Sequence, residues 1–323
     1  MRQLVSLSFM GLVLAGLVQH DVLAQSYPAK PVRMVVAFPP GTGVDILARS
    51  IGQKLSERWG QPVLIDNRAG AGGSVGTAAA AKSPPDGYTI TMGNLGTHAL
   101  NASLYQQLAY HPQRDFVPVT QVAAVPMLLV VHPALPVRSV RTLREIATSK
   151  PGELNYGSAG IGSVGHLSGE LFALVAGIKI VHVPYKGNQQ ALTDLLVGQV
   201  QMAFGNLLSY LPHARSGRVR SLAVTSRERS AAAPDIPTMA ESGLKNFEVT
   251  QWYGLFAPAN TPTAVADKLS ADVAEVLRIP EVRTRLENDG ANVGGPTRDQ
   301  FGAAVAREIE RWGEVIRKAG IQH

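Results

Sequence analysis

Two glycine-rich segments, each placed between an apolar run and a helical pattern, are the parts of this chain best suited to hold a ligand. The first is VVAFPPGTGVDILARS, residues 35–50, and the second is LNYGSAGIGSVGHLSGE, residues 154–170. A strand that ends at such a turn and opens a helix presents backbone N–H groups and the positive end of the helix dipole. Anions bind at such places. The repeated arrangement therefore predicts one small carboxylate held from two sides.

The residue types of the first segment fit this hypothesis. Gly41 and Gly43 permit positive φ angles and let the backbone come close to a ligand. The preceding prolines stiffen the approach, the Thr42 hydroxyl adds a donor, and an aromatic ring could wall a cleft. A simple strand–helix turn is the alternative for either segment taken alone, but two such loops favour a binding site. The residues predicted to bind ligand here are Phe38, Pro40, Gly41, Thr42 and Gly43.

Asp45 is open to two interpretations. As an acidic residue in the first turn of a helix, it is favoured as an N-terminal cap. Its alternative role is to pair with an ammonium group of the ligand, because a carboxylate placed beside a second carboxylate is unfavourable. Asp45 therefore stays in the candidate site without a settled role.

The second segment and two strand ends complete the candidate site. Asn94 and Asn206 each follow an apolar run, at the end of a strand where cleft residues gather, and either could instead form a turn. In the second glycine segment, Gly160 and Gly162 repeat the spacing of Gly41 and Gly43, with Ser158 and Ser163 on either side. The further residues predicted to bind ligand are Asn94, Ser158, Gly160, Ile161, Gly162, Ser163 and Asn206.

Two enzyme motifs occur, but neither has the context that its chemistry needs. Residues 160–165 match G-x-G-x-x-G, yet the following strand-like run, IKIVHVPY, carries no acidic residue for a ribose. Residues 72–76 match G-x-S-x-G, but several loop residues separate Ser74 from the preceding strand-like run, whereas a nucleophile elbow follows its strand directly. A secreted serine hydrolase is kept only as a rival hypothesis, and no enzyme activity is expected.

Composition narrows the class of protein. The 323 residues suggest about two domains. The net charge of +6 is spread along the chain without a Lys/Arg block, which argues against a nucleic-acid partner. There is no cysteine, so stability must come from core burial, and the histidines show no metal-ligand spacing. We expect no metal and no cofactor.

The N-terminus has the pattern of a secretory signal peptide. Arg2 forms a short positive region, a mostly apolar run of residues 4–18 follows, and Val22-Leu23-Ala24 precedes Gln25. The apolar run is short for a membrane-spanning helix. We expect cleavage near Ala24, with residues 1–24 removed, and a free mature protein in an exported compartment, most simply a bacterial periplasm.

Strand-like and helix-like runs alternate along the rest of the chain, which predicts an α/β protein with parallel sheets. The strand-like runs include residues 128–133 and 247–258, and Gly60 is expected to end the first helix. Further helices are expected around residues 140–149, 164–175, 189–197 and 207–216.

The alternation of strand-like and helix-like runs is interrupted once and then begins again, and residues 263–319 have a helical pattern. We expect two domains with the ligand cleft between them, and two chain crossings, near residues 117–130 and 247–257, that act as a hinge. Domain 1 is predicted to comprise residues 25–125 and 249–323, and domain 2 residues 126–248.

Five stretches resemble the Bug family of TctC-like solute-binding proteins. They are FPPGTGVDILAR, VLIDNRAGAGGSVGTAAAAKSPPDGYT, NYGSAGIGSVGHLSGELF, VHVPYKG and QWYGLFAPANTPTAVADKL, and they occur in order across nearly the whole mature chain. The resemblance implies a two-domain periplasmic binding protein of type II, the Venus-flytrap architecture. It also implies that backbone groups at the two loops hold a carboxylate.

The resemblance further implies a partner. Bug proteins serve tripartite tricarboxylate transporters, so this chain is expected to capture a small organic acid and deliver it, as a monomer, to the membrane subunits of such a transporter. A periplasmic subunit that reports ligand occupancy to a membrane signalling kinase is the alternative. The identity of the acid does not follow from the sequence.

Overall fold

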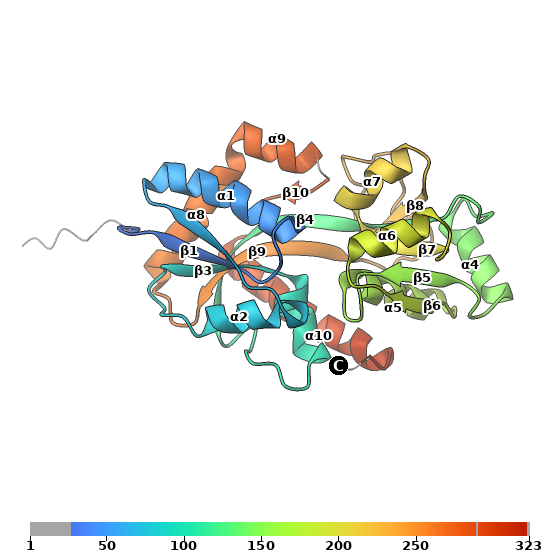
Figure 1. Cartoon of the computed structure of the whole chain (residues 1–323), viewed down its shortest axis with the longest axis horizontal. Coiled ribbons are helices and arrows are strands. Elements are labelled where there is room, and N and C mark those ends of the chain that lie inside the picture. Colours follow the sequence, from blue (N-terminus) through green and yellow to red (C-terminus); the bar gives the residue numbers. More distant parts are fainter. Residues whose placement is uncertain (1–26, 289, 322–323) are drawn as a thin grey trace, which may run out of the picture.

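The computed structural model describes residues 27–288 and 290–321. The predicted signal peptide, residues 1–24, lies outside the described residues. Figure 1 shows two α/β units side by side, joined by the long strands β4 and β9 that run through the middle of the molecule. None of the helices in the described part of the chain is both long enough and apolar enough to span a membrane.

The first unit is built on parallel strands, as the alternating pattern predicts. β1 pairs in parallel with both β2 and β3, and the strand order continues through β9 to β4. Gly60, in the left-handed conformation with φ +63°, ends the first long helix, which is the role that glycine commonly has after a helix. The elements are β1 (Val32–Val36), α1 (Gly43–Trp59), β2 (Val63–Asn67), α2 (Ser74–Ala81) and β3 (Thr89–Asn94).

The C-terminal helices return to this first unit. Asp272 is buried in α8, where its carboxylate accepts hydrogen bonds from Trp59 Nε1 (2.7 Å) and Arg58 Nε (2.9 Å) at the end of α1. Lys268 Nζ lies 2.7 Å from the same carboxylate. The contacts of Arg58 and Trp59 with Asp272 join residues more than two hundred positions apart. The elements are α8 (Thr263–Arg278), α9 (Pro280–Asn288), β10 (Asn292–Val293) and α10 (Arg298–Lys318).

The second unit repeats the parallel pattern. β5 pairs in parallel with β6 and β7, and β4 joins β7 and β8 in antiparallel pairs. Its helices closely match the ranges expected from apolar periodicity. The elements are α4 (Val140–Ser149), β5 (Asn155–Ser158), α5 (Val164–Ala176), β6 (Val181–Pro184), α6 (Asn188–Leu196), β7 (Met202–Asn206), α7 (Leu207–Arg215) and β8 (Arg220–Val224).

Two strands connect the units. β4 (Phe116–Val131) pairs with β9 (Thr250–Pro258) through residues 116–126 and with β7 and β8 through residues 127–131. Two apolar cores lie on opposite faces of the sheets, and each contains residues of both units. One core includes Phe301 of α10 and Leu167 of α5, and the other includes Leu47 of α1 and Leu192 of α6.

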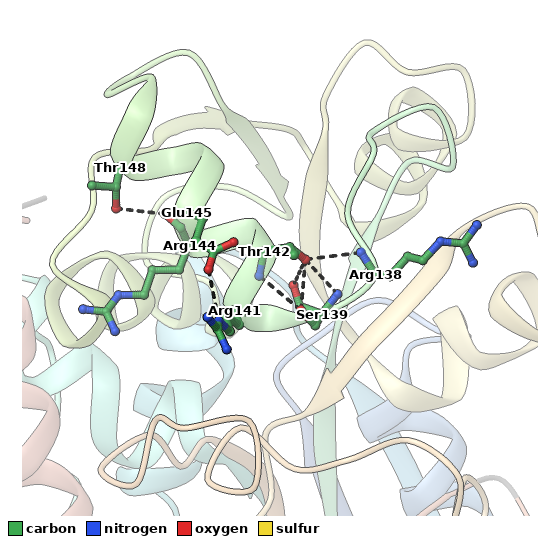
Figure 2. A network of polar contacts seen from close by, with 7 residues as sticks. All are labelled: Arg138, Ser139, Arg141, Thr142, Arg144, Glu145 and Thr148. Atoms are coloured by element: carbon green, nitrogen blue, oxygen red, sulfur yellow. Dashed lines mark hydrogen bonds and ion pairs between the residues drawn. The ribbon is translucent and has the colours of Figure 1, made fainter.

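Helix α4 shows how local sequence sets an element boundary (Figure 2). The Ser139 side chain accepts a hydrogen bond from the Thr142 N–H (3.1 Å), and the Thr142 hydroxyl oxygen accepts one from the Ser139 N–H (3.1 Å). This capping box satisfies two backbone donors that a helix start leaves without partners. Arg141 and Glu145, one turn apart, form an exposed ion pair of 3.0 Å. The helix therefore begins where the capping residues dictate.

Three elements differ from the sequence expectation. The run predicted as a strand from Leu128 begins at Phe116, because Pro118 and Pro126 obscure the pattern of one long strand. Pro118 lies at an irregularity in the β4–β9 register. A π-helical turn, η2 (Gly96–Leu100), and the short α3 (Asn101–Leu104) were not expected. The strand predicted over residues 247–258 starts three residues later, at Thr250.

His98 of η2 is enclosed in the core of the first unit. Its ring stacks on Phe256 with centroids 3.8 Å apart, and its Nδ1 lies 2.9 Å from the Thr97 hydroxyl oxygen. Among the buried side-chain nitrogen and oxygen atoms of the described residues, its Nε2 is the one that has no hydrogen-bond partner. Burial lowers the pKa of His98 from 6.5 to about 3, so the ring is neutral.

We predict that His98 makes the fold sensitive to acid. The unfolded chain binds a proton near pH 6.5 and the folded chain only near pH 3, so the free energy of unfolding falls as pH drops between these values. The slope for one such group is about 1.4 kcal/mol per pH unit. Urea unfolding of the wild type and of His98→Phe at pH 7 and pH 5 measures how the free energy of unfolding changes with pH in each protein. Parallel pH dependence in the two proteins would contradict the prediction.

Candidate functional site

The first glycine loop joins β1 to α1 and leaves the start of the helix without a side-chain cap. Gly41 has φ +82°, and no atom lies within 4 Å of the position that a Cβ would take there. Thr42 is the N-cap residue but its side chain caps no backbone N–H. The Thr42 hydroxyl donates to the Pro39 carbonyl instead (2.8 Å), so it is not the free donor that the sequence suggested. The N–H groups of the first helical turn therefore face the loop without a side-chain acceptor.

Asp45 holds this loop in shape. Its side chain is 2% exposed, and its carboxylate accepts hydrogen bonds from the Gly41 N–H (2.8 Å), Arg49 Nε (3.0 Å) and Asn67 Nδ2 (2.9 Å). Burial alone would raise the pKa of Asp45, but the hydrogen bonds from Arg49, Gly41 and Asn67 outweigh it and lower that pKa. Three donors occupy the carboxylate, so Asp45 has a structural role, but it is not the N-terminal cap that the sequence favoured. The N-cap residue is Thr42, and Asp45 is the third residue of α1. The Gly41 N–H is used in the same network.

Phe38 and Asn94 lie beside the first loop but have local roles. A Cβ on Gly73 would come within 3.0 Å of the Phe38 ring and 2.6 Å of the Thr97 methyl, so this ring packs against the turn before α2. The Asn94 Oδ1 accepts the Thr97 N–H (3.0 Å) and closes the turn after β3. Pro40, also predicted for the site, is exposed.

The second glycine loop satisfies more of its own donors than the first. The Gly160 N–H donates to Ser158 Oγ (3.1 Å), and the Gly162 N–H donates to His166 Nδ1 (3.0 Å). Ser163 is the N-cap of α5, and its side chain accepts the His166 N–H. The side chain of Ile161, at the tip of the loop, is 48% exposed. The two loops are therefore similar in sequence but unequal in hydrogen bonding.

Two histidines that the sequence reasoning did not select support the second loop. The rings of His166 and His182 stack with centroids 3.9 Å apart, and His182 Nε2 lies 2.6 Å from Ser158 Oγ. Burial lowers the pKa of His182 to about 4, which keeps it uncharged. Because His166 Nδ1 accepts a hydrogen bond, it carries no proton there. Nothing in the local sequence pattern relates residues 166 and 182, which meet only through the fold.

Tyr253 of β9 connects the two units at this site. A Cβ on Gly43 would lie 3.2 Å from the Tyr253 hydroxyl, so this hydroxyl lies against the first loop. Burial raises the pKa of Tyr253 to about 12, while its hydrogen bond with the Asn206 side chain acts in the opposite direction. Asn206, at the end of β7, therefore reaches the first loop through Tyr253. Successive side chains of β9 point to opposite faces of the sheet: Trp252 packs in the core beneath α10, and Tyr253 packs in the other core. This alternation is the sequence signal that could have identified Tyr253 as a site residue.

The second loop also reaches the first unit directly. A Cβ on Gly162 would lie 2.7 Å from Leu104 Cδ1, at the end of α3, and Gly162 has φ +75°. Both the space and the backbone conformation therefore require glycine at this position. The two units therefore contact each other at this site through Tyr253 with Asn206 and through Leu104 with Gly162. Asn94 and Phe38 contribute mainly to turns next to the first loop.

The enzyme motifs lack their contexts in the structure as well. β2 ends at Asn67 and α2 begins at Ser74, so the serine of G-x-S-x-G does not directly follow a strand. The strand that follows G-x-G-x-x-G is β6 (Val181–Pro184), which carries no acidic residue. Within residues 27–288 and 290–321, no three His, Asp or Glu side chains are grouped so that they could hold a metal ion.

The family model described as "Tripartite tricarboxylate transporter family receptor" (TctC) matches residues 47–321. The chain belongs to the TctC family. It is 39% identical to protein BugT of Bordetella pertussis over 300 residues, which are 93% of this chain and 92% of BugT. It is also 36% identical to a protein of Agrobacterium vitis from the TAR-I ttuE-ttuC' intergenic region, over 91% of this chain and 86% of the relative. The resemblance to Bug proteins is thereby confirmed.

Solved structures confirm the fold of this TctC-family chain. Rpa4515 of R. palustris, with adipate, has a TM-score of 0.83 and 40% identity, and the match covers 92% of this chain and 100% of that one. MatC of Rhodopseudomonas palustris, with bound malate, has a TM-score of 0.79 and 35% identity over 90% and 100%. The periplasmic binding protein BugD has a TM-score of 0.79, 34% identity and coverage of 92% and 100%. The protein is thus a two-domain solute-binding protein of the periplasmic type.

We predict that Asp45 is needed for the shape of the first loop. Asp45→Ala leaves the Gly41 N–H without its acceptor and removes one of the two acceptors of Asn67 Nδ2, which also donates to the Phe38 carbonyl. We expect a loss of roughly 2–3 kcal/mol in the free energy of unfolding. Glu57→Ala on the same helix is the matched control, because Glu57 pairs with Lys54 at the surface and its loss leaves stability nearly unchanged. Urea denaturation at pH 7 measures both. Equal stability of the two variants would show that the Asp45 network is dispensable.

Proposed function

We propose that this TctC-family receptor captures a small organic acid by a carboxylate and delivers it to the membrane subunits of a tripartite tricarboxylate-type transporter. The observation that carries the proposal is the start of α1, where a glycine loop meets a helix N-terminus that no side chain caps. Backbone donors and the helix dipole at such a place favour an anion. Adipate and malate, held by two relatives of known structure, are both dicarboxylates.

In this proposal the two loops have unequal parts. The N–H groups that follow Gly41 bind the carboxylate, and Asp45 acts through the loop rather than on the ligand, because its oxygens already have donors. The second loop closes over the ligand with its exposed tip, while its own hydrogen bonds keep it rigid. The ligand-binding residues that we propose are Phe38, Pro40, Gly41, Thr42, Gly43, Asn94, Ser158, Gly160, Ile161, Gly162, Ser163 and Asn206, with Asp45 as their support.

We further propose that ligand binding closes the two domains about β4 and β9. In support of this proposal, β4 changes its partner from β9 to β7 between Pro126 and Met127, next to the boundary expected at residues 125/126. The other expected boundary, at residues 248/249, precedes the start of β9 at Thr250. A ligand that touches both loops stabilises only the closed arrangement. The mature receptor acts as a monomer in the periplasm after removal of residues 1–24.

We predict that substitution of Gly41 prevents binding of the acid. Gly41→Val places a branched side chain in the open space beside the uncapped helix, so the affinity for adipate or malate should fall more than about tenfold, which is about 1.4 kcal/mol. Gly152→Val is the matched control: Gly152 has φ +80°, close to the +82° of Gly41, and both have free space around the Cβ position. Isothermal titration calorimetry on the wild type and both variants measures the effect.

The control separates strain from contact with the ligand. Both substitutions force a β-branched residue into a left-handed conformation, so both lower stability to a similar degree. Only Gly41→Val should lose binding. If Gly41→Val folds and binds the acid as tightly as Gly152→Val does, the proposed carboxylate site at the first loop is wrong. A wild-type protein that binds no member of a panel of adipate, malate and citrate would contradict the proposed ligand class.

We predict that the exported protein begins at Gln25. The short apolar run and the small residue at position 24 favour cleavage there. Mass spectrometry of the protein recovered from the periplasm of a bacterial host should give the mass of residues 25–323. An intact N-terminus that stays with the membrane fraction would contradict cleavage.

A further inference from the structure

A groove lies between the hinge strands, α10 and the segment after β8. It encloses about 340 Å³, within the range of roughly 300–1,000 Å³ seen for ligand pockets. Its lining comes from both units: Gln121 and Ala124 of β4, Trp252 of β9 and Phe301 of α10 on one side, and residues 226–228 with Glu248 on the other. Tyr253 of the candidate carboxylate site points to the opposite face of β9. The groove is therefore separate from the glycine loops.

The floor of the groove is apolar and aromatic. Trp252 and Phe301 are buried, and their rings meet edge to face with centroids 5.6 Å apart at 88°. Val305, one turn further along α10, is also buried and lines the floor. Trp252 is 7% exposed and Phe301 1% exposed, so only a small part of the Trp252 ring borders the groove. Tryptophan is the aromatic residue that attracts organic cations most strongly.

The rim carries an excess of negative charge. The charged residues of the lining are Glu228, Glu248, Glu308 and Arg227. The Glu308 carboxylate accepts hydrogen bonds from Trp312 Nε1 (2.7 Å) and Arg311 (3.4 Å). The Arg311 guanidinium also donates to the Glu248 carbonyl. The carboxylates of Glu228 and Glu248 are in none of the ion pairs formed within residues 27–288 and 290–321. They lie on the domain 2 side of the groove, opposite the aromatic floor.

We propose that this groove is a second binding site, for a small organic ammonium cation. The apolar body of the ligand packs on the floor formed by Trp252, Ala304 and Val305, and its positive charge lies between Trp252 and the carboxylates of Glu228 and Glu248. Such a cation contacts both units beside the strands that connect them. The proposal does not depend on the carboxylate site, because the two sites share no residue.

The test uses choline as the cation and 3,3-dimethylbutan-1-ol, its uncharged isostere, as the control ligand. The chain has three tryptophans, so a ¹H–¹⁵N spectrum gives three indole signals, of which Trp252→Phe assigns one. Choline should shift the Trp252 indole signal in a saturable way in the ligand-free protein. The Trp59 signal, whose indole N–H is bound to Asp272, should stay in place. The alcohol should cause no saturable shift.

Charge variants localise the site. The double substitution Glu228→Gln and Glu248→Gln should weaken choline binding at least about threefold, since each exposed carboxylate adds only a modest attraction. Glu310→Gln, on the same helix as Glu308 but outside the groove lining, should leave the affinity unchanged. The proposal is overturned if choline causes no saturable shift at Trp252, if the alcohol binds equally well, or if the double variant binds like Glu310→Gln. Failure of adipate or malate to bind would leave this result intact.

Discussion

The antiparallel pairing of β4 with β9 is the interaction on which the remaining architecture depends. Residues 116–126 pair with residues 258–250, and β4 then continues into the second unit without a break. The parallel strands of the two units each attach to this pair, β3 to β9 and β7 to β4. The chain crosses twice between the two sheets, with paired backbone groups at both crossings, so the domain closure that we propose would bend about that pair.

The alternation of side chains along β9 places different residues on the two faces of this strand pair. Tyr253 points toward the first glycine loop and Asn206, while Trp252, its neighbour, points into the core beneath α10. Successive residues of a strand face opposite sides, so a single short segment contributes to both of the proposed sites. Rotation about the proposed hinge would move both side chains together, because they belong to one strand.

The polar groups around the glycine loops follow the rule that buried polar atoms need partners. Asp45 is buried, and it is accommodated because three donors from the loop, the helix and β2 converge on its oxygens. His166 and His182 serve as hydrogen-bonding groups behind the second loop, and burial disfavours a charged ring at His182. The first loop keeps its helix start open, and the second closes most of its donors on itself. A carboxylate is therefore expected to interact most strongly with the first.

Local sequence was sufficient for much of the fold and for the position of both loops. Apolar periodicity located α4 and α5, glycine located the end of α1, and the strand–glycine–helix pattern located the two loops. Short-range rules decide these features, because the relevant contacts lie within one turn or one strand. The tertiary structure decided the rest. Long-range pairing made one strand of residues 116–131 despite its prolines, brought Asn67 to Asp45 and His182 to Ser158, and placed Tyr253, rather than Trp252, beside Gly43. No local pattern carries these contacts, because their partners are separated by 22 residues or more, and only the packed sheets bring them together.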